Sequence, residues 1–161
     1  MFRFRASTKL PSNDLLNSAL YDERYFYGAF MKDLKHVTSD VLIESPYLTV
    51  KRAKELAPIF KKLKKSHISV RINTREPKHH DRVLRAQSIQ AIVILKKAGV
   101  KVYVCSDFRH RKIAILDKTI LWEGSLNILS QSKSREIMRR TDSRTLCKQM
   151  LSFTGIQNKF W

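Results

Sequence analysis

Residues 110–127 read HRKIAILDKTILWEGSLN and contain two short apolar runs, at 113–116 and 119–122. Only Asp117 and Lys118 separate these runs. Two apolar runs on either side of a two-residue polar gap are typical of a β-hairpin with a tight turn. The stretch therefore predicts a β-hairpin with polar residues on both strands at the end away from the turn.

The predicted turn also fixes which residues of the hairpin face one another. In an antiparallel pair the numbers of facing residues sum to a constant, which places Leu116 opposite Thr119, Lys112 opposite Glu123 and His110 opposite Ser125. Side chains two positions apart share a face, so four polar side chains are expected together: His110, Lys112, Ser125 and Asn127. Four apolar side chains are expected on the other face: Ile113, Ile115, Ile120 and Trp122. The polar group suits an anion such as a phosphoryl group.

The segments before the hairpin alternate between helical and strand patterns. The spacing of apolar residues predicts helices at 15–37, 51–65 and 82–98, with strands at 41–43, 68–72 and 100–105. Strands that alternate with helices indicate an α/β sandwich with a mixed, largely parallel sheet flanked by helices. We expect one domain over residues 1–161, with residues 141–161 forming a C-terminal helix and tail packed on it.

The charge of the chain favours a polyanionic partner. Lys and Arg number 32 against 14 Asp and Glu, which gives a formal net charge of +18. Nucleic acid is the favoured partner, with an anionic membrane surface as the alternative. No apolar run approaches the ~20 residues needed to cross a bilayer, and the N-terminus has no secretion signal. We therefore expect a cytoplasmic protein without a membrane span, in which Cys105 and Cys147 stay reduced.

The polar residues of the hairpin follow the pattern HxK(x)4D(x)6GSxN, which resembles the HKD signature of the phospholipase D superfamily. Its fixed positions are His110, Lys112, Asp117, Gly124, Ser125 and Asn127. The resemblance covers most of the chain, because residues 45–47 (SPY) and 99–102 (GVKV) also look like the small nucleases of that family. Residues 124–140 look most like nuclease-type domains that occur alone or fused to helicases. The chain carries a single copy of the motif.

The resemblance implies a mechanism that needs neither a metal ion nor a cofactor. His110 would attack phosphorus and form a covalent phosphohistidine. Lys112 and Asn127 would hold the non-bridging oxygens, assisted by Ser125. Glu136 would correspond to the acidic residue of the family that hydrogen-bonds the histidine ring. Asp117 is assigned to the turn and, like Gly124, to the structure of the motif.

A second histidine is needed to protonate the leaving oxygen, yet no other HxK occurs in the chain. The remaining histidines, His36, His67, His79 and His80, do not fit the motif. The resemblance therefore implies a homodimer in which two copies of the motif face one another across a two-fold axis. The two identical histidines would then hold different protonation states.

Two further groups of polar or charged residues could bind a phosphate or a metal ion. Arg71, Arg75, Arg109 and Arg111 are candidates for binding the phosphates of a nucleic acid. His79, His80 and Asp81 do not have the spacing of a metal site and are better explained as a polar loop.

These features together predict a metal-independent endonuclease, with DNA as the favoured substrate. One alternative is a phospholipid-headgroup hydrolase or phosphatidyltransferase. Another is a non-catalytic nucleic-acid-binding module of a larger helicase or restriction system. The sequence leaves open whether DNA or RNA is bound, and whether single or double strands are.

Overall fold

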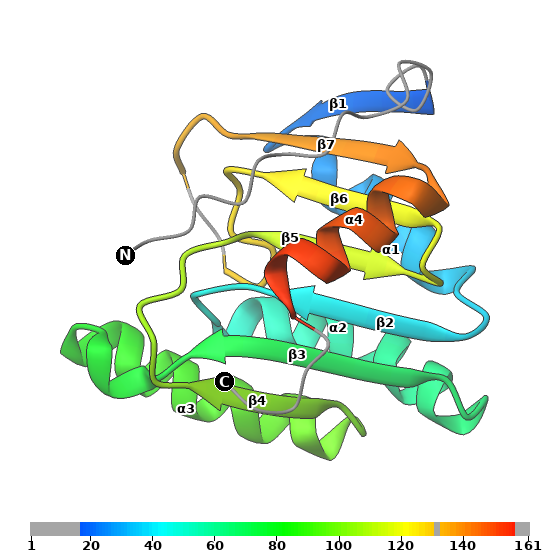
Figure 1. The fold of residues 1–161 in the computed structure, drawn as a ribbon. Helices are drawn as coiled ribbons and strands as arrows, with labels where there is room; N and C mark the ends of the chain where they lie inside the picture. Colours follow the sequence, from blue (N-terminus) through cyan, green and yellow to red (C-terminus); the bar gives the residue numbers. More distant parts are fainter. Residues whose placement is uncertain (1–16, 131–132, 157–161) are drawn as a thin grey trace.

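A computed structural model describes residues 17–130 and 133–156, which form a seven-stranded sheet with helices on both faces (Figure 1). The strand order is β1-β7-β6-β5-β2-β3-β4. In chain order the elements are β1 (Ser18–Asp22), α1 (Phe26–Lys35), β2 (Asp40–Glu44), α2 (Val50–Lys65), β3 (Ser69–Arg75), the short 3-10 helix η2 (Pro77–His79), α3 (Arg82–Lys97), β4 (Lys101–Cys105), β5 (Ile113–Leu116), β6 (Ile120–Gly124), β7 (Ile137–Asp142) and α4 (Arg144–Thr154). The predicted α/β class with a mixed sheet flanked by helices is confirmed.

The segment from β2 to β4 follows the predicted alternation. β2, β3 and β4 are parallel neighbours, and α2 and α3 connect them. Each helix begins after a residue whose side chain caps it: Thr49 accepts a hydrogen bond from the Arg52 N–H, and Asp81 accepts one from the Leu84 N–H. α3 ends before Gly99, whose φ of +89° lies in the region that favours glycine.

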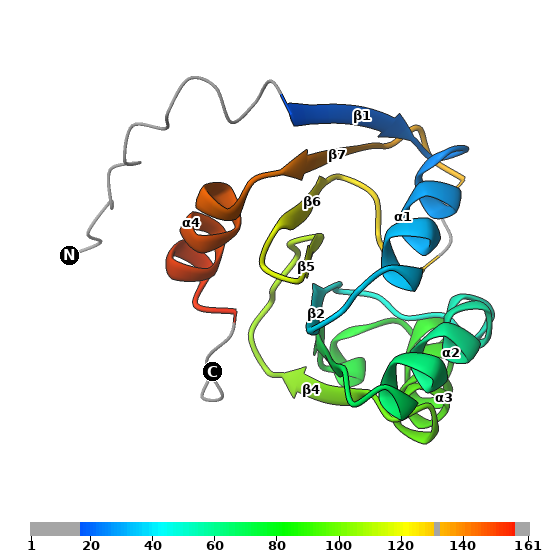
Figure 2. The same cartoon turned by 90° about the vertical axis from the view of Figure 1, so that its right-hand side faces the viewer.

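The helices divide unevenly between the two faces of the sheet. Figure 2 shows α1, α2 and α3 on one face and α4 on the other. The larger core lies under the first three helices and includes Phe26, Phe30, Leu56, Phe60 and Trp122, all fully buried. A smaller core joins α4 to the sheet through side chains such as Leu42, Ile115, Leu121, Leu146 and Cys147. Within the described residues, no helix combines the length and apolar composition needed to cross a bilayer.

The prediction of one helix at 15–37 is wrong. Residues 18–22 form the edge strand β1, which pairs antiparallel with β7, and the helix starts only at Phe26. The Asp22 carboxylate separates the two elements, because it accepts hydrogen bonds from the backbone N–H groups of Arg24 and Tyr25. Leu20 fits the helical spacing but is 59% exposed on the strand. Residues 15–16 lie outside the described part of the chain.

The hairpin of β5 and β6 is confirmed, but its predicted pairing is wrong by one residue. Leu116 pairs with Ile120 rather than with Thr119, and Ile113 pairs with Glu123. Residues 117–119 therefore connect the strands, with Asp117 and Lys118 at φ values of 53° and 54°. The predicted apolar face is split as a result: Ile113 and Ile115 contact the core under α4, whereas Trp122 and Ile120 contact the core on the opposite face.

The sheet contains more antiparallel pairing than predicted. Only β2 with β3 and β3 with β4 pair in parallel, and the other four pairings among the described strands are antiparallel. Two of these four involve β7, a strand that the sequence pattern did not reveal. The helix α4, at Arg144–Thr154, lies within the segment 141–161 for which a C-terminal helix and tail were predicted.

Candidate active site

His110 lies in the connection between β4 and β5, next to the carboxyl ends of the parallel strands β2, β3 and β4. Carboxyl ends of neighbouring parallel strands are the usual position of a ligand site in α/β folds. The His110 side chain is exposed, and its Nε2 lies 3.4 Å from the hydroxyl of Tyr47, a residue of the loop after β2. The two rings meet edge to face, with their centroids 5.6 Å apart. The candidate nucleophile is therefore accessible and held at one side by an aromatic ring.

Lys112 is the second member of the motif and contacts His110 directly. Its Nζ lies 2.6 Å from Nδ1 of the imidazole and 2.8 Å from the His110 backbone oxygen. Burial lowers the pKa of His110, and the positive charges of Lys112 and Arg75 lower it further. A lowered pKa keeps the imidazole neutral at neutral pH, which is the form that can act as a nucleophile.

The two arginines that flank His110 are held by one buried carboxylate. Arg109 donates to Glu44 at 3.0 Å, and Arg111 donates to the same carboxylate from Nε at 2.6 Å and from Nη2 at 3.2 Å. Arg109 also forms two hydrogen bonds of 2.6 Å with Asp107, which lower the pKa of Asp107. Both arginines, predicted as phosphate contacts, thus have carboxylate partners, and their clearest effect is to fix the backbone on either side of His110.

Glu136 lies close to both Ser125 and Lys112. The Ser125 hydroxyl accepts a hydrogen bond from the Ile137 N–H at 3.1 Å, which ties the end of β6 to β7. Hydrogen bonds from Ser125 and Ser134 lower the pKa of the Glu136 carboxyl, and the charge of Lys112 lowers it further. Within the described residues, no hydrogen bond joins Glu136 to His110. The structure therefore brings Glu136 to the lysine and the serine rather than to the imidazole ring.

Asn127 lies in the loop after β6, which is fastened to the loop after β2. The Ser45 hydroxyl accepts a hydrogen bond from the Leu129 N–H, and the Leu129 oxygen accepts one from the Thr49 N–H. Oδ1 of Asn127 is buried and has no hydrogen-bond partner among the described residues. Unpaired buried polar atoms are rare, and a functional site is one of the places where they occur.

Gly124 and Asp117 have structural roles at opposite ends of β6. A Cβ atom on Gly124 would lie 2.2 Å from the backbone oxygen of Ile137, so only glycine allows β7 to approach this closely. The Asp117 carboxylate accepts hydrogen bonds from the backbone N–H groups of Thr38, Ser39 and Asp40, which fastens the hairpin turn to the loop before β2. Asp117 thus lies in the connection between β5 and β6.

The other two predicted arginines lie on β3 at different distances from its end. Arg75 is the last residue of the strand, and its guanidinium lies 4.8 Å from the ring centre of Phe108. Arg71 lies in the middle of the strand, where its guanidinium stacks 4.3 Å from the ring of Tyr103. The structure therefore brings Arg75 to the site and leaves Arg71 further along the sheet.

Some residues of the site were missed by the sequence reasoning. The sequence pattern placed Glu44 at the end of a buried strand but did not identify it as part of the site. No feature of the sequence identified Phe108. The interpretation of His79 and His80 as a polar loop is incomplete, because His79 stacks on Phe108 and His80 packs against Tyr47. Within the described residues, no three His, Cys, Asp or Glu side chains are grouped as a metal site. Both cysteines are free, and burial raises the pKa of Cys147 to about 12.

Several solved structures share this fold. The phospholipase D family member Nuc from Salmonella typhimurium matches with a TM-score of 0.67 and 18% identity over 84% of this chain and 91% of its own. NucT from Helicobacter pylori matches with a TM-score of 0.70 and 20% identity over 87% and 92%. The archaeal chromatin protein TrmBL2 matches with a TM-score of 0.56 and 10% identity, over 88% of this chain and 51% of its own.

At the level of sequence, a comparison with curated proteins gives no match. The model of the family described as "Cardiolipin synthase, PLD-like domain" matches residues 30–154, which include β2 to β7 and residues 110–127. This match covers most of the chain, and we conclude that the protein belongs to the PLD-like domain family.

Proposed function

We propose that this protein is a metal-independent phosphodiesterase that cleaves nucleic acid, with DNA as its substrate. The observation that carries the proposal is the 2.6 Å contact between the exposed His110 imidazole and the Lys112 side chain, and the lowered pKa of His110 favours its neutral form. The imidazole can attack phosphorus, and the ammonium group can neutralise the charge that develops on the phosphate oxygens. The net charge of +18 supports nucleic acid as the substrate.

The reaction would proceed in two displacements at phosphorus. In the first, a nitrogen of His110 forms a bond to phosphorus, and the bond to the leaving oxygen breaks as that oxygen takes up a proton. In the second, water attacks phosphorus and loses a proton, and the bond to the histidine breaks. Lys112, Ser125 and the Asn127 amide would hold the non-bridging oxygens in both steps.

The nucleophilic His110 cannot also donate the proton that the leaving oxygen takes up, so another group must act as the acid. We propose that a second copy of the chain supplies it through its own His110, so that two chains share one site in a homodimer. One imidazole would then be neutral and the other protonated, as coupled groups in a single site can be. A protein that cleaves DNA while light scattering shows only monomers would refute this part of the proposal.

Cleavage of plasmid DNA in excess EDTA tests the proposed function. We expect nicking that persists in EDTA, is abolished in His110→Ala, and is unchanged in the control His36→Ala, whose ring lies at the end of α1. Salt-sensitive DNA binding should survive in His110→Ala, because many lysines and arginines contribute to it. Loss of cleavage on chelation, or equal cleavage by His110→Ala, would refute the proposed chemistry.

A phospholipid-headgroup hydrolase or transferase is the second candidate, because the description of the matching family names cardiolipin synthase. The same EDTA-treated protein can be given fluorescent phospholipid in vesicles beside the plasmid. Faster turnover of the lipid than of DNA would favour this candidate. A protein that binds DNA and turns over neither substrate would instead be a non-catalytic module, the partner of a larger helicase or restriction system.

A further inference from the structure

Phe108 is an exposed aromatic residue held in a fixed position next to His110. It lies two residues before the histidine, and 73% of its surface is exposed. His79 stacks on the Phe108 ring with 4.6 Å between centroids and 19° between planes, and the Arg75 guanidinium lies 4.8 Å from the ring centre. The Arg75 side chain also donates to the His79 backbone oxygen at 3.4 Å. These contacts order the ring while most of it remains open to solvent.

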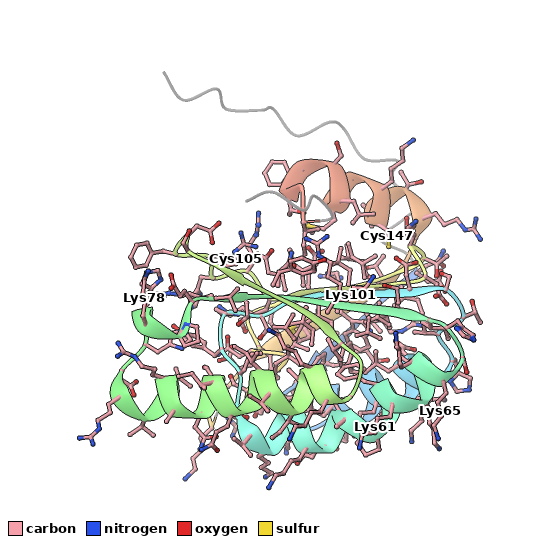
Figure 3. The ribbon with its side chains drawn as sticks, turned by 90° about the horizontal axis from the view of Figure 1, so that it is seen from below. Lys61, Lys65, Lys78, Lys101, Cys105 and Cys147 are labelled. Atoms are coloured by element: carbon pink, nitrogen blue, oxygen red, sulfur yellow. The ribbon has the colours of Figure 1, made fainter. Side chains whose placement is uncertain are left out.

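The Phe108 cluster is continuous with the candidate active site. The loop after β3 is joined to the end of β4, because the Glu76 N–H donates to the Cys105 oxygen at 3.0 Å. Figure 3 shows Lys78 of this loop and Cys105 at the same end of the sheet, while Lys61 and Lys65 of α2 lie toward the other end. From the neighbouring residue His80 the contacts pass to Tyr47 and then to His110, with ring centroids 5.1 Å and 5.6 Å apart.

The cluster also has unused hydrogen-bonding capacity. Nε of Arg75, Nδ1 of His79 and Nε2 of His80 are buried and have no hydrogen-bond partner among the described residues. The last of these residues is only 8% exposed. Buried nitrogens without partners cost free energy, and two of these three residues, Arg75 and His79, contact the Phe108 ring.

An ordered aromatic ring beside a phosphate site suits one feature of a nucleic acid, the flat face of an unpaired base. Stacking on a ring does not depend on which base is present, and a neighbouring guanidinium strengthens it. In a duplex the base faces are covered by the adjacent base pairs and cannot reach the ring. An isolated exposed phenylalanine would carry no such argument, and Phe153 on α4, 69% exposed, provides that comparison.

We propose that Phe108, His79 and Arg75 form a stacking platform for an unpaired base next to the scissile phosphate, so that the substrate is single-stranded nucleic acid. This inference rests on the proposed nuclease function, because the platform is placed next to the phosphate that would be cleaved. Stacking of a base on the platform can nevertheless be tested without cleavage.

The test measures binding in the His110→Ala background with a DNA oligonucleotide that contains 2-aminopurine, both single-stranded and as a duplex. We expect the single strand to bind more tightly than the duplex and its fluorescence to be quenched on binding. Adding Phe108→Ala should weaken binding of the single strand by about 5- to 150-fold and remove the quenching. Phe108→Trp should retain both properties, and the matched control Phe153→Ala should change neither.

Two results would overturn the platform: equal effects of Phe108→Ala and Phe153→Ala, or a duplex that binds as tightly as the single strand with the same dependence on Phe108. Failure of the proposed function is seen separately, in the plasmid assay with an intact His110. Quenching that depends on Phe108, in a protein that cleaves no DNA, would refute the nuclease and support the platform. Cleavage of DNA without quenching that depends on Phe108 would support the nuclease and refute the platform.

Discussion

Arg109 donates a hydrogen bond to the Glu44 carboxylate at 3.0 Å, and the two side chains are only 2% and 0% exposed. Arg111 donates to the same carboxylate from the other side of His110. A carboxylate at the end of β2 therefore determines the backbone position of a residue more than sixty positions later in the chain. The candidate nucleophile is placed by an ion pair rather than by the strand that follows it.

Removal of this carboxylate should destabilise the fold strongly. Glu44→Ala removes a carboxylate partner of the buried Arg109 guanidinium, and loss of one member of a buried pair typically costs about 3–5 kcal/mol. Urea unfolding measures the change in the free energy of unfolding. The control Glu76→Ala breaks a partly exposed pair with Lys78 and should cost at most about 1 kcal/mol. Similar losses in both variants would contradict the role given to Glu44.

Asp117 should stabilise the protein in a way that depends on pH. Burial tends to raise the pKa of its carboxyl, but hydrogen bonds from the backbone of Thr38, Ser39 and Asp40 outweigh burial and lower it. The stabilisation is then complete above the unfolded pKa of about 3.9 and is lost as the pH falls through the lower folded value.

Asp117→Asn removes the charge and should lower the free energy of unfolding at pH 7 by about 1.5–3 kcal/mol, the usual range for hydrogen bonds to a charged group. Urea unfolding from pH 7 down to pH 3 should show a smaller loss of stability on acidification in this variant than in the native protein. Asp142→Asn, at the exposed end of β7, serves as the control. An unchanged acid dependence in Asp117→Asn would show that the turn carboxylate does not carry the effect.

The central part of the fold was predictable because its signals are local. α2 and α3 each show an apolar face of helical period, a capping side chain at Thr49 or Asp81, and a defined end such as Gly99. The pairing of the hairpin was not local. It depends on the contacts of Asp117 with residues 38–40, which no pattern within the hairpin contains.

The strands β1 and β7 and part of the site could not be predicted, for the same reason. β7 (IMRRTD) places two arginines in a strand, and Arg140 is accommodated by a bidentate ion pair with Asp33 of α1, a partner over a hundred residues away. In the site, the spacing of the motif identified His110, Lys112, Ser125 and Asn127 as candidates. Glu44 and Phe108 act through partners distant in sequence, so no spacing could identify them.

Gly124 should be intolerant of even one added carbon. The Cβ of Gly124→Ala would lie 2.2 Å from the Ile137 oxygen and 2.9 Å from the Met138 Cα, both backbone atoms, so β6 and β7 must separate. We expect a loss of about 1–3 kcal/mol in urea unfolding. DNA cleavage should fall as well, since the Ser125 N–H donates to the same Ile137 oxygen.

Gly28→Ala is the matched control for this variant. It lies in α1 with nothing within 4 Å of the added carbon, and should stabilise the helix by about 0.5–1 kcal/mol. A loss of stability in both glycine variants, or in neither, would remove the argument from the close approach of β7.

The charge of Arg75 should contribute to the acid limit of the reaction. Burial lowers the pKa of His110, and the charges of Lys112 and Arg75 lower it further. Since the nucleophile must be neutral, the cleavage rate should fall as the pH drops through this lowered value. Arg75→Gln removes one positive charge, so the pKa of His110 rises and the fall in rate moves to higher pH.

An NMR titration of the His110 ring measures this shift without relying on turnover, and the pH dependence of DNA cleavage measures it a second time. Arg82→Gln removes an equal charge from α3 and should move neither, because its charge is not among the causes that lower the His110 pKa. If both variants moved the titration equally, the effect would come from the net charge of the protein, and Arg75 would have no special place beside the imidazole. If only Arg75→Gln moved the titration while the rate profile stayed fixed, protonation of His110 would not limit cleavage, and the assignment of this residue as the nucleophile would fail.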